Sequence, residues 1–415
     1  MLVVILTSLS VLITACQTGT DTGSLTPTSA IDAQVPTSIV TEETATSAFT
    51  PEPTHSAALD ALLAPGPTIP PPDGLFFQLD DDIWYLPGAE PARRVVEGQR
   101  LGPWAQTADG ARIALVRYRE ENGEAVEEIV IVNNDGSSGD PIYGPAPTAG
   151  AAGRPAIRAL AWSWDGQSLA AILTNETIAT MRFAADDPFR TQPPLESIDI
   201  PETGAAPNEI AWAPSGAGIA YTLAGVGGAA LFVTPSSDTA RAVIAPGDSP
   251  SRAVRAFDWL PGRGRLVFVE AAGGPASHLP GSIFTIAPDG TLLELLVSAG
   301  QFAPAATIAT LSAGSDGRDL AFTVQVPDAQ GQQVFQSLWI LSIDSGELQQ
   351  VPLETGYQVA DVAWSASGLV WRGIDRNARV PGDGQPYTGE EPFILGRFDP
   401  AGGMSTVVFQ STLVD

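Results

Sequence analysis

The chain offers few side chains that could carry out covalent or acid–base chemistry. Its 415 residues include one cysteine, two histidines and no lysine, so all 20 basic side chains are Arg. The absence of lysine excludes a GxxxxGK phosphate loop, a Schiff-base lysine and a Ser-Lys pair. A single cysteine excludes an internal disulfide and cysteine-rich zinc sites. These exclusions favour a binding protein over an enzyme.

Three consecutive aspartates, Asp80, Asp81 and Asp82, form the one cluster that could bind a metal. Ca²⁺ prefers clustered oxygen ligands, but such a run is also typical of a charged hairpin turn. The segment 133–140, NNDGSSGD, lacks the D-x-D-x-D-G spacing of a calcium loop. We therefore expect a turn at 80–82 and no cofactor, with calcium as the alternative.

The single cysteine, Cys16, follows an apolar run at residues 1–15, MLVVILTSLSVLITA. This run is too short to span a bilayer and is typical of a secretion signal. Ile13-Thr14-Ala15-Cys16 resembles the lipobox of bacterial lipoproteins, although no basic residue precedes the apolar run. The resemblance implies a signal peptide at 1–15 and lipidation of Cys16. It places the protein at the bacterial cell membrane, lipid-anchored on the extracytoplasmic side.

Residues 16–72 are rich in Thr, Ser and Pro and show no apolar period. Such a segment cannot bury enough surface to offset the entropy of ordering it. We expect a disordered linker between the lipidated cysteine and a folded domain at 73–415. Within the linker, residues 57–63 are compatible with a helical turn.

From residue 73 onward one pattern recurs, in which an apolar strand, a glycine turn and a second apolar strand follow one another. Successive turn glycines are 46–56 residues apart: Gly110, Gly166, Gly216, Gly262, Gly317 and Gly368. Glycine accepts the positive φ that such hairpin turns need. A third strand follows in each unit, at 81–86, 127–132, 177–183, 229–233, 282–286, 337–341 and 392–398. Short strands at this period predict an all-β propeller of seven four-stranded blades, with six or eight blades as alternatives.

Tryptophan recurs where the first strand of a unit ends, at Trp162, Trp212, Trp259 and Trp364. We expect these side chains to be structural, each wedged between neighbouring blades, because burial of a large side chain contributes about 2–3 kcal/mol. An aromatic ligand cage is the alternative. Gln106 and Ala313 stand at the same place in two units, and a ligand cage would tolerate such gaps less easily than a packing role.

The turn motifs resemble the WD40-like propeller repeats of TolB-type periplasmic proteins. The matching segments are Trp162–Gly166 with Leu169–Ala171, Trp212–Gly216 with Ile219–Tyr221, and Ser315–Gly317 with Leu320–Phe322. The resemblance covers about residues 73–415 and implies a fold rather than an activity. TolB carries an additional α/β domain where this chain has only the linker, so TolB's partners are not carried over.

The connections between second and third strands differ greatly in length, and the long ones are expected at 117–128, 270–280, 325–336 and 373–392. Long loops on one face of a rigid scaffold often carry function. We therefore place a candidate binding face there. Its residues are Arg117, Glu120, Glu121, His278, Asp375, Arg376, Asp383 and Tyr387.

The formal net charge of −27 argues against nucleic acid as a partner, because its phosphates require a basic face on the protein.

The leading hypothesis is a membrane-anchored propeller lipoprotein that binds a protein partner in the cell envelope or acts as a scaffold, without catalysis. The alternative is a propeller enzyme acting on extracellular glycans or lactones. An enzyme would need carboxylates or histidines converging near the axis. Only Asp258 and Asp361 supply acid groups to the expected axial strands.

Overall fold

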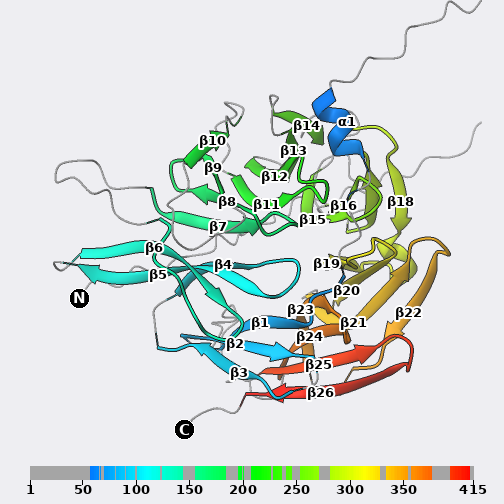
Figure 1. Cartoon of the computed structure of the whole chain (residues 1–415). Helices are drawn as coiled ribbons and strands as arrows, with labels where there is room; N and C mark the ends of the chain where they lie inside the picture. The colour runs from blue at the N-terminus through cyan, green and yellow to red at the C-terminus, as the bar shows by residue number, and fades with distance from the viewer. Residues whose placement is uncertain are drawn as a thin grey trace, which may run out of the picture. The chain divides into compact units, whose positions relative to one another are not determined.

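Nearly all of the described chain is antiparallel β-sheet, arranged as the blades of a propeller (Figure 1). The computed structural model describes residues 57–415 except for 65, 67–69, 80, 89, 99–100, 122–123, 144–154, 184–194, 199, 201–206, 226–227, 236–239, 245–252, 271–280, 328–332, 354–356, 376–392 and 412–415. In Figure 1 the sheets succeed one another in chain order, from the blue strands β1–β3 to the red strands β25 and β26. The expected all-β propeller is confirmed.

Seven blades can be distinguished among the described residues, five with four strands and two with three. Blade 1 contains β1 (Gly74–Leu79), β2 (Asp82–Pro87) and β3 (Arg93–Val96), and blade 2 contains β4 (Leu101–Gln106), β5 (Arg112–Glu121) and β6 (Glu124–Asn133). Blade 3 contains β7 (Ile157–Trp162), β8 (Ser168–Leu173), β9 (Ile178–Arg182) and β10 (Leu195–Ile198). Blade 4 contains β11 (Pro207–Trp212), β12 (Gly218–Gly225), β13 (Gly228–Pro235) and β14 (Arg241–Ile244).

The three remaining blades each have four strands. Blade 5 contains β15 (Val254–Leu260), β16 (Arg265–Glu270), β17 (Ile283–Ile286) and β18 (Glu294–Val297), followed by a 3₁₀ turn at Ala299–Gln301. Blade 6 contains β19 (Thr307–Ala313), β20 (Asp319–Pro327), β21 (Gln333–Ser342) and β22 (Glu347–Val351). Blade 7 contains β23 (Tyr357–Ser365), β24 (Gly368–Asp375), β25 (Phe393–Asp399) and β26 (Met404–Gln410). A single residue pair, Ala229 with Val254, joins blades 4 and 5 into one eight-stranded sheet.

The two three-stranded blades are incomplete in different ways among the described residues. In blade 2 the outer position is taken by two isolated bridges, Ile129 with Tyr143 and Val132 with Ser138. Blade 1 begins with β1, which corresponds to the second strand of the other blades because β2 matches the expected third strand at 81–86. Blade 1 therefore has no inner strand within the described residues. The C-terminal strand β26 does not supply one, since it pairs with β25 as the outer strand of its own blade.

The hydrophobic core is divided into seven clusters, and each lies in a seam, meaning the interface between one blade and the next. Strand residues alternate between the two faces of a sheet, so each blade presents one apolar set to the blade before it and another to the blade after it. In blade 3, for example, Leu169 and Ala171 face blade 2, whereas Ala170 and Ile172 face blade 4. The apolar alternation in the sequence is therefore used on both sides of every sheet.

The seam between blades 7 and 1 joins the two ends of the described propeller without exchange of a strand. Its buried cluster is Phe77, Leu86, Val370, Phe393 and Leu395. The Arg397 guanidinium donates to the carbonyls of Pro87, at 3.3 Å, and Gly88. The Ala366 amide donates to the Pro72 carbonyl at 2.8 Å.

The packed part of the chain begins before residue 73. Helix α1 (Ala57–Leu63) buries Leu59 and Leu62 in the seam between blades 4 and 5. Pro70 and Pro71 then lie against the hairpin turns of blades 6 and 7, where they border a small cavity with Ser315. Helix α1 and residues 70–72 thus contact successive blades on the hairpin-turn side.

The turn glycines provide a test of how tightly blades approach one another. Gly317 and Gly216 have φ of 66° and 70°. A Cβ at Gly317 would lie 1.9 Å from the Pro261 carbonyl oxygen of the preceding blade, whereas a Cβ at Gly216 meets nothing within 4 Å. Gly216→Ala should cost about 1–2 kcal/mol of unfolding free energy from backbone strain alone. Gly317→Ala should cost about 1–3 kcal/mol more because of overpacking. Equal losses in denaturant titrations of the two variants would contradict this account of the turns.

Candidate functional site

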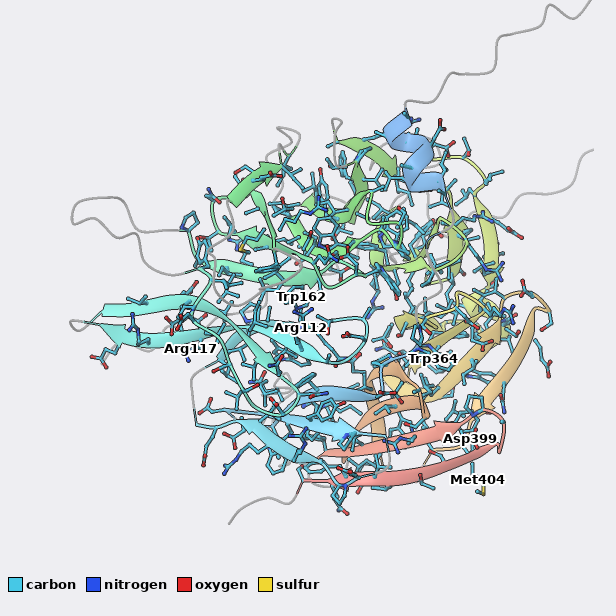
Figure 2. All side chains as sticks on the ribbon, in the orientation of Figure 1. Arg112, Arg117, Trp162, Trp364, Asp399 and Met404 are labelled. Carbon is cyan, nitrogen blue, oxygen red and sulfur yellow. The ribbon has the colours of Figure 1, made fainter. Side chains whose placement is uncertain are left out.

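Four indole N–H groups tie the inner strand of one blade to the inner strand of the blade before it. Trp162, Trp212 and Trp259 are at most 9% exposed. Each acceptor is the carbonyl of the residue just before the equivalent position in the preceding blade. The bonds are Trp162 to Ala105 at 3.1 Å, Trp212 to Ala161 at 3.0 Å, Trp259 to Ala211 at 3.3 Å and Trp364 to Ser312 at 3.0 Å. In Figure 2, Arg112 lies beside Trp162, with its guanidinium carbon 5.6 Å from the ring centroid.

Gln106 stands where blade 2 would carry such a tryptophan. Blade 1 has no inner strand among the described residues, so the carbonyl that an indole would require is missing there. The Gln106 side chain instead reaches β1, where its Oε1 accepts from the Phe76 amide at 2.9 Å and its Nε2 approaches the Gly74 carbonyl at 3.5 Å. The side-chain amide thereby makes contacts with β1 of the kind that the backbone of a neighbouring strand would make.

Ala313 stands at the same position in blade 6, and here the link between blades runs in the opposite direction. The Asp258 carboxylate of blade 5 accepts from the Ala313 amide at 3.0 Å with Oδ2 and from the Trp259 amide at 2.8 Å with Oδ1. Burial of this carboxyl raises the pKa of Asp258 to about 6, although the two amide bonds favour the charged form. Asp258 thus connects two blades that no indole links.

The ends of the inner strands surround a cavity of about 590 Å³ at the hairpin-turn end of the axis. This volume is within the range of small-ligand sites. Six tryptophans contribute to its lining: Trp104, Trp162, Trp164, Trp212, Trp259 and Trp364. Its charged lining residues are Asp258, Asp361 and Arg372. The described lining is thus mainly aromatic and apolar, with two carboxylates and one guanidinium.

Asp361 and Arg372 are paired across β23 and β24 and face the cavity together. Water can reach Asp361 inside the cavity, but the surrounding protein desolvates it, and this burial raises the pKa of its carboxyl against the effects of the Val362 amide and of Arg372. The Arg372 guanidinium carbon lies 4.6 Å from the ring centroid of Phe393. Its Nε is buried without a hydrogen-bond partner.

Several residues of this cavity went unnoticed in the sequence because no pattern singled them out. Trp104 and Arg372 lie outside the turn motif, and Gln106 looked only like a gap in it. Trp164 is part of the WSW segment, and its indole donates to the Trp212 carbonyl at 3.0 Å. Glu209 lies on the inner strand of blade 4 outside the cavity lining, and burial raises the pKa of its carboxyl to about 7. A glutamate directly before the apolar residues Ile210, Ala211 and Trp212 was the available signal for Glu209.

The expected loop at 117–128 is wrong, because β5 and β6 continue through it as a long hairpin. The segment is rich in Arg and Glu, and the register places Arg117 opposite Glu128. Arg117 pairs with Glu128, whose side chain is 3% exposed, and Arg119 lies 4.0 Å from the same carboxylate. Glu120 and Glu121 end β5, and Glu120 is exposed. Arg117 is therefore engaged within its own blade (Figure 2).

The other residues of the candidate face are not brought together by the described part of the chain. Asp375 is the last residue of β24. His278, Arg376, Asp383 and Tyr387 lie outside the described residues, as do Cys16 and the signal segment. No described helix is long and apolar enough to cross a membrane.

The aspartate run at 80–82 leads into β2. Asp80 lies outside the described residues, and Asp81 is in the turn before the strand. Asp82 accepts from Arg94 at 3.0 Å and from the Gly98 amide at 2.6 Å, so both of its oxygens serve the hairpin. Among the residues that the structure describes, no group of three or more His, Cys, Asp or Glu side chains could hold a metal.

Comparison with known proteins gives a fold and no family. No family model matches the chain, and no curated protein matches it. A chain from a structural study of two prolyl endopeptidases superposes with a TM-score of 0.55 at 12% identity and covers 85% of this chain. The present chain spans about half of that endopeptidase chain, 51%. At this identity the likeness shows the propeller fold alone.

Two further solved structures are similar at lower scores. A protein assigned as TolB from Agrobacterium tumefaciens has a TM-score of 0.42 at 18% identity, covering 65% of this chain and 83% of its own. The β-propeller domain of a Myceliophteria thermophila protein has a TM-score of 0.45 at 12% identity, covering 76% and 87%.

The raised pKa of Asp258 predicts how stability depends on pH. The folded state binds this proton more tightly than the unfolded state does, so the contribution of Asp258 to stability is fully present below the unfolded pKa, near 4, and is lost as the pH rises through about 6. Asp258→Asn removes this titration. Unfolding free energies measured between pH 4 and pH 7 should therefore fall less steeply in D258N than in the parent protein. Identical slopes for the parent and D258N would contradict the assignment.

Proposed function

We propose that this protein is a non-enzymatic binding propeller, anchored through lipidated Cys16 to the extracytoplasmic side of a bacterial membrane, where it binds a protein partner or serves as a scaffold. The lipobox-like segment supports the anchor, and the Thr/Ser/Pro-rich segment after it supports a tether. The fold supports a binding role because a rigid propeller presents loops and a central cavity without requiring catalysis.

The observation that carries the non-enzymatic interpretation is how the acid groups of the cavity are used. Both oxygens of Asp258 accept from backbone amides, and Asp361 accepts from the Val362 amide beside Arg372. A general acid or base needs a free oxygen directed at a substrate. Five of the six cavity tryptophans donate their N–H groups to carbonyls of a neighbouring blade. Asp258 and these indoles thus connect blades, whereas the bond of Asp361 lies within its own strand.

The second candidate function is an enzyme acting on extracellular glycans or lactones. The observation in its favour is that Asp258 and Asp361 line one cavity and both have raised pKa values, as the general acid of a glycosidase does. Hydrolysis of fluorogenic glycosides or lactones that is lost in both D258N and D361N would establish this function in place of binding.

Lipidation can be tested by growing cells with an alkyne-tagged fatty acid. The full-length protein should become labelled and sediment with membranes, because several acyl chains anchor a protein firmly. Cys16→Ser should lose the label and appear in the soluble fraction. Thr20→Ser, a few residues downstream, is the matched control and should behave like the parent. Labelling that persists in C16S would refute the anchor.

Partner binding can be tested by in-cell crosslinking and affinity capture of the lipidated protein. If the partner uses the candidate face, shortening residues 376–392 should remove a defined envelope protein from the captured set by at least tenfold. A control with the same number of residues deleted from 20–50 should retain it. Crosslinks that are nonspecific, or equal in both variants, would count against a protein partner on that face.

A further inference from the structure

The Arg372 guanidinium lines the central cavity and has no acceptor among the described residues. Its Nε is buried without a hydrogen-bond partner. Arg265 and Arg397 also have an Nε of this kind, but their terminal nitrogens donate to protein oxygens. Arg372 makes no hydrogen bond and no ion pair with any described residue. The residue is partly exposed, so a molecule in the cavity can reach its terminal nitrogens.

The ring of Phe393 holds the guanidinium in place. The guanidinium carbon lies over this ring, 4.6 Å from its centroid. Stacking on an aromatic ring restricts an arginine without using its N–H donors. Across the sheet, Arg372 is paired with Asp361 on one side and with Leu395 on the other, and both of these residues line the cavity. The planar fork of donors is therefore fixed beside the cavity and available to a ligand.

From Arg372 the cavity continues into the seam between blades 7 and 1. Val370 and Arg372 are two residues apart on β24 and therefore point to the same face of the sheet. Five apolar side chains line this extension, which we call the seam pocket: Leu75, Phe77 and Leu86 of blade 1, and Val370 and Leu395 of blade 7. The seam pocket thus combines an apolar wall with one cationic fork.

The charges in the cavity determine which head group fits beside this fork. A carboxylate accepts two parallel hydrogen bonds from a guanidinium. A phosphate monoester would bring a charge of about −1.5 to −2 into a cavity that Asp258 and Asp361 also line. A cationic head group would be repelled by Arg372. Burial raises the pKa of the Asp361 carboxyl, which favours its neutral form and reduces its repulsion of a single carboxylate.

We propose that the cavity binds a small aromatic carboxylate, with its carboxylate on the Arg372 fork and its ring in the seam pocket. Phe77 supplies an aromatic ring to the pocket, and six tryptophans contribute to the rest of the lining. Offset or edge-to-face contacts between aromatic rings add to the gain from apolar burial. The cavity volume of about 590 Å³ accommodates such a ligand. The inference goes beyond the proposed function, because this site binds a small molecule and does not depend on a protein partner.

Four naphthalene compounds that differ in head group test the assignment: naphthoate, naphthamide, naphthyl phosphate and naphthylmethylammonium. Isothermal titration calorimetry is carried out with the full-length protein in detergent, and titrations into detergent alone are subtracted. Naphthoate should bind about tenfold more tightly than each of the other three, as expected for hydrogen bonds between charged groups. It should also raise the unfolding temperature, because it binds the folded state. Octanoate, which has the same head group and no ring, should bind several-fold more weakly than naphthoate.

Substitutions of charged residues test the contact with the carboxylate. Arg372→Met should remove the preference for naphthoate over naphthamide, and Arg372→Lys, which keeps the charge without the fork, should retain part of it. Asp361→Asn removes a like charge and should tighten naphthoate binding several-fold. Arg158→Met is the matched control, because Arg158 is an exposed arginine of an inner strand that lies outside the described lining. This control should bind naphthoate like the parent.

Two tryptophan substitutions on β23 test the position of the ring. Ala363 pairs with Val370, and both line the cavity. Ala363→Trp should therefore fill the seam pocket and abolish naphthoate binding. Ala360→Trp, on the same strand but outside the described lining, should leave binding intact. Thermal unfolding checks that every variant folds.

Four results would overturn the inference. The first is neither heat nor a rise in unfolding temperature with any compound, which would mean that water alone solvates the guanidinium. The second is equal binding of naphthoate and naphthamide by the parent, or a preference that persists in R372M. The third is tightest binding of the phosphate or of the ammonium compound, which would assign the cavity to another class of ligand. The fourth is naphthoate binding by A363W equal to that of the parent.

Discussion

Each blade exposes two apolar faces, and its neighbours on either side cover them. This mutual dependence determines the structure, because a sheet of three or four strands has no buried face of its own. Apolar burial alone does not specify which atoms of two blades meet, and the indole hydrogen bonds do specify this. A buried N–H without a partner would cost about 1–3 kcal/mol, so each tryptophan is held where the preceding carbonyl lies. The donors and acceptors lie at the same end of successive inner strands. These bonds therefore also prevent neighbouring blades from shifting along the axis relative to one another.

The seam between blades 7 and 1 has to be held together by other means. Its cluster contains five buried residues, whereas the seam between blades 2 and 3 contains fifteen. No indole bond reaches it in the described structure, because blade 1 offers no inner strand to carry the donor. Edge-on and tilted aromatic rings, including Phe77, Phe393 and Phe409, compensate in part. Arg397 adds a charged donor to two carbonyls of blade 1. This seam is therefore the place where the ring has the fewest buried constraints.

The sequence predicted the repeat well because its strongest signals are local. A glycine with positive φ between two alternating apolar strands is encoded within about ten residues, and the tryptophans mark the end of each inner strand. The hairpin of blade 2 was predicted as a loop because residues 117–128 are mostly Arg and Glu, and the sequence does not show that Glu128 is buried opposite Arg117. The cavity could not be predicted in the same way. Trp104, Asp258 and Arg372 meet only because the ring brings blades 2, 5 and 7 to one axis, and no spacing in the sequence records that.

Gln106 and Asp258 show that departures from the repeat follow the needs of neighbouring blades. Where the preceding blade has no inner strand among the described residues, a side-chain amide replaces the indole and bonds to a strand edge. Where the indole itself is missing, a carboxylate from the preceding blade takes over the link, at the cost of burying that carboxylate. The hydrogen-bonding groups of Asp258 and of five cavity tryptophans are thus committed to joining blades. Among the described lining residues, the aromatic faces, the Asp361 carboxyl and the Arg372 guanidinium take no part in these links.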